Sequence, residues 1–343
     1  MAGGVGSRFW PMSTPENPKQ FLDVLGIGKT LIQMTFERLL SVSPVENIYI
    51  LTNMDYKELV LEQLPLLKPE QVLTEPERKN TAPCIAYAAA KIHSLNENAN
   101  LIVAPADHLI MQTDKFASTI FSAIESANAG RIATIGISPT RPDTGYGYIE
   151  FEASEELKAN DCVEVQQFRE KPDLETAKQF VAAGNFYWNS GIFIWKSSTI
   201  LNALKDFQPS LFALFAKELS AYNTQKEQDF VNHAFATCED ISVDFAIMEH
   251  AKNIDVVLAS FDWSDLGTWG SLDTHLSKDA DNNSIVGNST HLFNSKNCIV
   301  NIPNGNEAII DGLDGYIVVQ SENRLMILKK ENEQELKQFL KKL

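Results

Sequence analysis

The residues of this chain that could do chemistry begin at its first positions. Gly3, Gly4 and Gly6 lie within four residues, and glycine lets a backbone adopt positive φ and approach a ligand closely. Successive backbone N–H groups in such a loop can bind an anion. Arg8 and Lys19 then add positive charge, one as a planar fork and the other as a point charge. These residue types suit the binding of a polyphosphate and the stabilisation of charge at phosphorus.

Two better-known glycine motifs do not fit this stretch. The dinucleotide pattern GxGxxG fails because Phe9 stands where the third glycine belongs. A Walker A loop ending at Gly28–Thr30 fails because Asp23 stands at its leading glycine. A glycine-rich turn with an arginine and a lysine there by chance remains an alternative, because short motifs give false positives.

Two aspartates are candidates for binding a metal ion. Residues 101–104 are typical of a buried strand, and Asp107 follows that strand after a proline. A carboxylate there can bind Mg²⁺, which keeps several waters and bridges phosphate oxygens; the alternative is an aspartate that only caps a turn. Asp265 can bind the same ion only if the fold brings the two aspartates together. The nearby Asp262 is a competing candidate for this second metal ligand. For His108 we favour a structural role over that of a base, because phosphoryl transfer depends mainly on charge stabilisation.

Strands and helices alternate through the first part of the chain. Apolar residues recur at helical spacing after short buried runs, which predicts an α/β fold with a Rossmann-like, doubly wound and mostly parallel sheet. In such sheets ligands bind at the carboxyl ends of strands. The predicted strands of this part are residues 47–52, 101–104 and 132–137, and the predicted helices include residues 30–40 and 81–92.

The pattern of apolar and polar residues changes after about residue 280. Short apolar runs separated by Asn, Gly and Asp follow one another, as in a small β-solenoid. We therefore expect a catalytic domain over residues 1–280 and a small β-rich domain over residues 281–343. A closing helix over residues 333–343 carries an apolar stripe, which favours packing on that domain or on a partner subunit over a membrane anchor.

Composition limits the classes of partner. The 343 residues carry a formal net charge of −16, which argues against a nucleic acid. No apolar run reaches the length of a membrane span, and no leader precedes the glycine loop, so we expect neither membrane insertion nor secretion. Four cysteines lie far apart without metal-ligand spacing, which is typical of reduced thiols in a cytoplasmic protein.

The order of motifs resembles that of the sugar-1-phosphate nucleotidyltransferases, and most of all the mannose-1-phosphate guanylyltransferases. The resemblance covers residues 2 to about 340, and its motifs are specific as an ordered set. They are carried by Ala2–Pro11, Pro18–Leu22, Glu75–Thr81, Pro105–His108, Gly145–Tyr148, Glu170–Pro172, Asn189–Gly191 and Trp263–Trp269.

The resemblance implies a role for each matching residue. The catalytic cations would be Arg8 and Lys19, and Mg²⁺ would be held by Asp107 and Asp265. The residues implied to bind the nucleotide are Ala2, Gly3, Gly4, Gly6, Ser7, Glu75, Asn80 and Thr81. Those implied to bind the sugar phosphate are Gly147, Glu170, Lys171 and Asn189, with Lys171 on the phosphate.

The resemblance also implies a reaction: GMP passes from GTP to mannose 1-phosphate, giving GDP-mannose and pyrophosphate. It implies a nucleotidyltransferase fold with a C-terminal domain of the left-handed β-helix type, and the solenoid edge and closing helix suit a homodimer. Alternatives are the same chemistry with glucose 1-phosphate and UTP or dTTP, or a non-catalytic relative that binds nucleotide sugars.

Two further expectations concern the ends of the chain. Relatives normally carry an apolar strand just before the Ala2–Gly4 stretch, so we expect a truncated start. Some longer relatives add a C-terminal isomerase domain, for which this sequence leaves no room, so we expect no isomerase activity.

Overall fold

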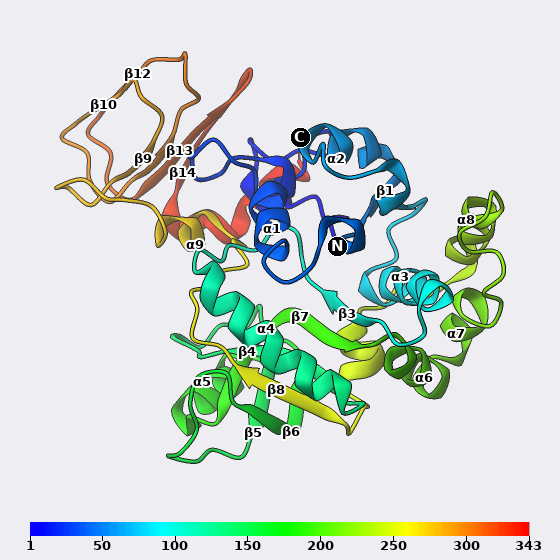
Figure 1. The fold of residues 1–343 in the computed structure, drawn as a ribbon. Coiled ribbons are helices and arrows are strands. Elements are labelled where there is room, and N and C mark those ends of the chain that lie inside the picture. Colours follow the sequence, from blue (N-terminus) through cyan, green and yellow to red (C-terminus); the bar gives the residue numbers. More distant parts are fainter. Residues whose placement is uncertain (343) are drawn as a thin grey trace. The chain divides into compact units, whose positions relative to one another are not determined.

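The structure is a computed structural model that describes residues 1–342 (Figure 1). Its internal contacts divide the chain into two compact units, each assembled from separate segments. The first unit comprises residues 1–3, 38–105 and 110–263, and the second unit comprises residues 4–37, 106–109 and 264 onward. No boundary between the two units lies at residue 280. The expected domain boundary at that residue stays a prediction.

A six-stranded sheet forms the centre of the first unit. Its strands lie in the order β3 (Asn100–Val103), β7 (Phe186–Lys196), β4 (Ile132–Ile137), β8 (Ile254–Leu258), β6 (Cys162–Arg169) and β5 (Tyr148–Phe151). Only β4 and β8 pair in parallel, and the other neighbours are antiparallel.

The prediction of a mostly parallel sheet is therefore wrong, because this sheet is mixed. Strand β7 lies between β3 and β4 and runs antiparallel to both, with Ile194 opposite Ile102 on one side and Ala133 on the other. The alternation of strands and helices in the sequence indicates the class of fold. It does not indicate that a strand from much later in the chain separates two successive ones.

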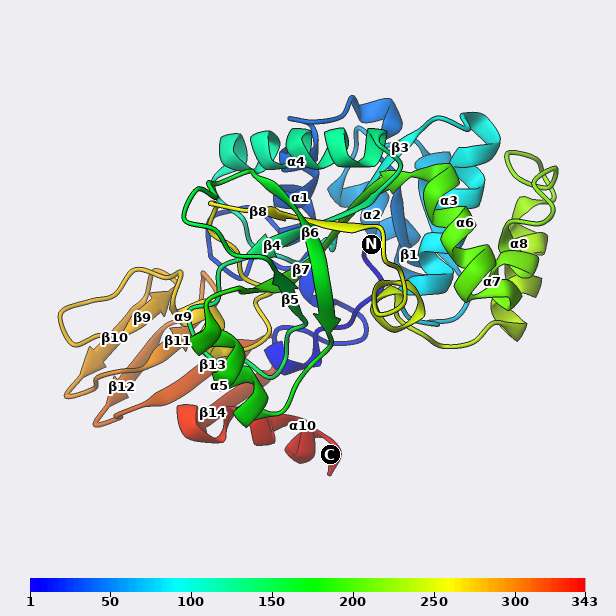
Figure 2. The same ribbon diagram turned by 90° about the horizontal axis from the view of Figure 1, so that it is seen from below.

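Both faces of this sheet are covered by helices, as Figures 1 and 2 show. Alternate residues of β7 point to opposite cores: Phe193 and Trp195 join one, and Ile194 joins the other. One core includes residues of α3 (Thr81–Leu95), α6 (Ser197–Phe207), α7 (Pro209–Phe215) and α8 (Glu227–Thr237), and the other includes residues of α4 (Thr113–Asn128) and α5 (Leu174–Ala183). The predicted α/β class is confirmed, because helices pack on both faces of the sheet.

A separate pair of strands lies near the start of the first unit. β1 (Ile50–Asn53) and β2 (Val72–Glu75) are parallel and are joined through α2 (Lys57–Gln63). The first two residues reach this pair and the end of β3: the Ala2 N–H donates to the Leu51 carbonyl at 2.7 Å, and the Met1 amine donates to the Ala104 carbonyl at 2.8 Å.

The second unit contains the β-rich C-terminal segment. β9 (Ser284–Val286), β11 (Ile299–Asn301) and β13 (Tyr316–Ser321) stack in parallel, β14 (Arg324–Lys329) pairs antiparallel with β13, and β10 (Thr290–Phe293) pairs in parallel with β12 (Ala308–Asp311). The β-rich segment is thus present, while its description as a left-handed β-helix stays a prediction.

The core of the second unit joins residues that are far apart in the sequence. Phe9 from the glycine-rich loop and Trp269 from α9 (Trp269–Asp273) have ring centroids 4.9 Å apart. Ile317 of β13 and Leu336 of α10 (Leu336–Leu340) are buried in the same cluster, as is Leu31 at the start of α1 (Leu31–Leu39). The closing helix packs on its own β-rich segment, and it begins at Leu336 after a 3₁₀ segment rather than at residue 333. Leu343, the last residue of its predicted stripe, lies outside the described residues.

We expect Glu227→Gln to lower the free energy of unfolding by about 3 kcal/mol, because it leaves the buried Lys91 ammonium without its counter-charge. In the first unit these groups are 2.6 Å apart, and their side chains are only 8% and 13% exposed. Urea denaturation measures the change. The control is Glu175→Gln, at an exposed pair with Lys178, where a change below about 0.5 kcal/mol is expected; equal effects at both sites would contradict the assignment.

Candidate active site

The glycine-rich loop is shaped by one residue with a left-handed backbone. Gly6 has φ 70° and precedes the 3₁₀ turn at Ser7–Phe9. A Cβ at this position would collide with the Lys19 side chain. The Lys19 N–H donates to the Val5 carbonyl at 3.1 Å. The loop and the Pro18–Lys19 turn therefore fit together only with glycine at position 6.

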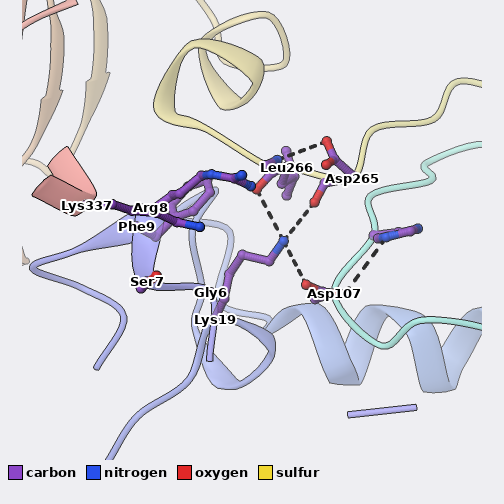
Figure 3. A pocket seen from close by; sticks show the side chains of 11 residues that line it. Gly6, Ser7, Arg8, Phe9, Lys19, Asp107, Asp265, Leu266 and Lys337 are labelled. Carbon is purple, nitrogen blue, oxygen red and sulfur yellow. Dashed lines mark hydrogen bonds and ion pairs between the residues drawn. The ribbon is translucent and has the colours of Figure 1, made fainter. Parts of the chain in front are cut away.

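Lys19 is the central residue of this site. Its side chain is 5% exposed, and its ammonium lies 2.8 Å from Asp107 Oδ2. The same nitrogen donates to the backbone carbonyl of Asp265 at 2.7 Å and to that of Leu266 at 3.2 Å, as Figure 3 shows. An ammonium has three N–H donors, so Lys19 uses them all on the protein and ties Asp107 to the segment that carries Asp265.

A cavity of about 270 Å³ lies around these groups, entirely within the second unit. Arg8, Lys19, Asp107 and Asp265, all predicted from the sequence, line it together. The other lining residues are Gly6, Ser7, Phe9, His108, Leu266, Gly267 and Lys337. The fold thus brings Asp107 and Asp265 to one cavity, which is the condition for a shared metal ion, while their role toward a metal stays a prediction.

The charges of the cavity fit a metal ion with an anionic ligand. Burial raises the pKa of Asp107, but the Lys19 ammonium and His108 outweigh it and hold that pKa below its usual value. Asp265 Oδ1 accepts a hydrogen bond from the Gly267 N–H at 3.0 Å. Residues 1–342 contain no cluster of three or more His, Cys, Asp or Glu placed to hold a metal. Two carboxylates alone suit Mg²⁺, which takes its remaining ligands from water and phosphate.

A second group of polar residues lies within the first unit and contains the predicted sugar-binding residues. The Asn189 N–H donates to the Gly147 carbonyl at 2.8 Å. A Cβ on Gly147 would lie 2.5 Å from Glu170 Oε2, so only glycine leaves room for that carboxylate. Lys171 Nζ lies 2.5 Å from the other Glu170 oxygen, Oε1. The structure therefore brings Gly147, Glu170, Lys171 and Asn189 together.

Asp244 is a member of this group for which the sequence predicted no binding role. Its Oδ1 accepts a hydrogen bond from Asn189 Nδ2 at 2.9 Å, and Thr134 donates to Asn189 Oδ1 at 3.1 Å. Burial and then the neighbouring Glu170 raise the pKa of Asp244 to about 6. The stretch Val243–Phe245 also matches a motif of the family that this sequence resembles, where it is usually structural, and this match is the signal that could have found Asp244.

The predicted base-binding residues also lie in the first unit. Glu75, at the end of β2, is 5% exposed, and its Oε1 has no hydrogen-bond partner among residues 1–342. A Cβ on Gly3 would lie 3.3 Å from Glu75 Oε2. Burial raises the pKa of Glu75 to about 7, although Cys84 and Arg78 act in the opposite direction. A buried carboxylate without a partner is costly unless a ligand satisfies it.

Three other residues that are predicted to bind the nucleotide make hydrogen bonds within the protein. Both backbone groups of Ala2 are engaged, the N–H with Leu51 and the carbonyl with the Thr52 hydroxyl. Asn80 caps α3 by accepting from the Thr81 N–H at 3.0 Å. The Thr81 hydroxyl accepts from the Val243 N–H at 2.8 Å. These contacts position the loop, and a role of these residues toward a nucleotide stays a prediction.

A family model described as nucleotidyl transferase matches residues 1–282. The chain belongs to this family. It is 36% identical over 347 residues to the mannose-1-phosphate guanylyltransferase RfbM of Salmonella typhimurium, covering 99% of this chain and 71% of RfbM. It is 37% identical over 351 residues to the alginate biosynthesis protein AlgA of Pseudomonas aeruginosa, covering 100% of this chain and 71% of AlgA.

Solved structures give the same assignment of fold. A mannose-1-phosphate geranyltransferase from Thermus thermophilus superposes with a TM-score of 0.89 at 27% identity, over 100% of this chain and 97% of that one. A mannose-6-phosphate isomerase from Helicobacter pylori superposes with a TM-score of 0.59 at 30% identity, over 73% of this chain and 95% of that one. The expected nucleotidyltransferase fold is confirmed. No helix within residues 1–342 is long and apolar enough to cross a bilayer.

We expect Gly6→Ala to destabilise the protein by about 2 kcal/mol or more, because alanine is strained at φ 70° and its Cβ meets Lys19. Gly4→Ala is the matched control, since a Cβ there would have no atom within 4 Å. Thermal unfolding of both variants measures the difference. A Gly6→Ala variant as stable as Gly4→Ala would show that the loop does not require the left-handed backbone.

The free energy of unfolding of the wild type should fall as the pH rises from about 4 to about 6. We expect Asp244→Asn to make this decrease smaller. The folded-state pKa of about 6 lies above the usual 3.8, so the folded protein binds more protons than the unfolded chain in this interval, and its stability falls as pH rises. The shift corresponds to about 3 kcal/mol at most. Urea unfolding at pH 4.5 and 7.5 tests this: the variant should gain stability relative to wild type at the higher pH, and a difference independent of pH would contradict it.

Proposed function

We propose that this protein transfers GMP from GTP to mannose 1-phosphate, giving GDP-mannose and pyrophosphate. The observation that carries the proposal is the Lys19 ammonium, which holds Asp107 beside the Asp265–Leu266 segment in a cavity that Arg8 and the glycine-rich loop also line. The similarity to RfbM, a mannose-1-phosphate guanylyltransferase, supports this choice of substrates.

The reaction is a direct displacement at phosphorus. A phosphate oxygen of mannose 1-phosphate attacks the α-phosphorus of GTP, an oxygen–phosphorus bond forms, and the bond to the bridging oxygen of the β-phosphate breaks. The attacking oxygen is already anionic, so no general base is needed, which agrees with a structural role for His108. Positioning and charge stabilisation provide most of the acceleration.

The second unit handles the phosphates in this proposal. The backbone N–H groups of Gly4, Gly6 and Ser7 and the Arg8 guanidinium bind the triphosphate. Asp107 and Asp265 would hold Mg²⁺, which would supply positive charge to the phosphate oxygens. Lys19 acts through the positions of these two aspartates, since its N–H groups already bind Asp107 and two carbonyls.

The first unit supplies the groups that recognise the base and the sugar. The buried Glu75 carboxylate beside Gly3 accepts hydrogen bonds from the guanine N1–H and N2–H donors. The group formed by Gly147, Glu170 and Asn189 binds mannose hydroxyls, and Lys171 neutralises the sugar phosphate. An unpartnered acceptor and a glycine with no room for a side chain support these roles.

Three further features belong to the proposal. The parallel stack in the C-terminal segment is of the left-handed β-helix type. The protein acts in the cytoplasm, in agreement with its four free cysteines. It forms a homodimer, for which the edge of the C-terminal β-rich segment and the exposed Phe339 of the closing helix are suited.

Pyrophosphate release in the presence of Mg²⁺ tests the reaction, with GTP, ATP, UTP and dTTP each combined with mannose and glucose 1-phosphates. We expect release with GTP and mannose 1-phosphate. Release only with glucose 1-phosphate and UTP or dTTP would instead give the same chemistry with other substrates. No release with any pair would favour a non-catalytic relative that binds nucleotide sugars.

We expect Asp265→Asn to lower kcat by about 10²-fold or more, because it removes a charge that positions the metal at the reacting phosphate. The matched control is Asp262→Asn, since Asp262 accepts hydrogen bonds from the Met111 and Gln112 N–H groups and is not part of the cavity lining. We expect it to keep kcat within a few-fold. Comparable losses of kcat in both variants would contradict the assignment of Asp265.

A further inference from the structure

The C-terminal helix contributes a positive charge to the cavity that the sequence motifs do not include. Lys337, in the first turn of α10, lines the cavity beside Arg8, and both belong to the second unit. Figure 3 shows the Lys337 side chain next to Arg8 and Phe9, with Asp107 and Asp265 on the other side of Lys19. No motif pointed to Lys337, because it lies far in sequence from every other residue of the site.

The position of α10 is fixed by contacts of the residues that immediately precede Lys337. Leu336, the preceding residue, is 4% exposed within the apolar core of the second unit. Before it, the Glu333 carboxylate accepts a hydrogen bond from the Gly270 N–H at 3.1 Å, and Lys330 lies 2.9 Å from Asp273. The helix is therefore anchored to α9, which follows the Asp265 segment directly.

Arg8 and Lys337 differ from Lys19 in that neither is neutralised. Among residues 1–342, neither side chain makes a hydrogen bond or an ion pair with the protein, and both are exposed to the cavity. The Arg8 guanidinium, followed by partial burial, lowers the pKa of Lys337. Two like charges held close together repel each other unless an anion lies between them. Of the carboxylates of the cavity, Asp107 is paired with Lys19, and Asp265 Oδ1 accepts a hydrogen bond from the Gly267 N–H. Neither forms an ion pair with Arg8 or Lys337 among residues 1–342, so neither neutralises this pair of cations.

We propose that Lys337 and Arg8 together bind the terminal phosphates of the nucleoside triphosphate, the part that leaves as pyrophosphate. The inference rests on the proposed function and extends it: the C-terminal helix supplies a substrate-binding residue of the active site. These two cations stabilise the negative charge that develops on the leaving group as its bond to the α-phosphorus breaks.

The probe for this site is inorganic pyrophosphate, which is both a product and the substrate of the reverse reaction. In isothermal titration calorimetry with Mg²⁺ present, Lys337→Met should weaken pyrophosphate binding about tenfold, the loss expected for one charge-assisted contact. Lys341→Met removes the same charge one turn later and outside the cavity lining, and it should change the affinity less than twofold. Lys337→Arg should retain most of it.

Kinetics of the reverse reaction distinguish a loss of pyrophosphate binding from a general disturbance of the protein structure. With Lys337→Met, the KM for pyrophosphate should rise while the KM for GDP-mannose and the melting temperature stay unchanged. Unchanged pyrophosphate affinity in Lys337→Met, or an equal loss in Lys341→Met, would overturn the inference. If the proposed function fails, no substrate pair gives turnover. A loss of pyrophosphate affinity in Lys337→Met, but not in Lys341→Met, would then still support the anion site.

Discussion

The position of one buried ammonium determines the geometry of the candidate active site. Lys19 Nζ lies within 3.2 Å of Asp107 Oδ2 and of the carbonyl oxygens of Asp265 and Leu266. A buried lysine is costly unless acceptors surround it, so these three acceptors are held where the ammonium requires them. Gly6 is constrained by the same side chain, since a Cβ there would collide with it. The glycine-rich loop and the two aspartates thus share one central contact.

The charges of the second unit are divided between two tasks. Lys19 holds the Asp107 carboxylate and the backbone of Asp265, and both aspartates line the cavity, where a divalent cation with phosphate ligands fits. Arg8 and Lys337 have no such neutralisation and lie where an anion is needed. The chain as a whole carries a net charge of −16, so attraction of a polyphosphate depends on this local arrangement and on the divalent ion rather than on the overall charge.

The chemistry was more predictable from the sequence than the topology. Arg8, Lys19, Asp107 and Asp265 were predicted from residue type and motif, and they line one cavity. The sheet was predicted as mostly parallel and is mixed, because local periodicity does not determine which strand lies beside which; the insertion of β7 between β3 and β4 depends on tertiary packing. Asp244 and Lys337 were missed for the same reason, since only the fold places them against Asn189 and Arg8.

The central claim is that Lys19 and Asp107 act as one unit that positions the phosphates and their metal ion. A double-mutant cycle in kcat/KM with Lys19→Met, Asp107→Asn and the combined variant tests it most directly. The account predicts strong non-additivity: each single variant loses most of the activity, and the double variant is little worse than either. Losses that multiply in the double variant would show that the two residues act independently, and would contradict the account.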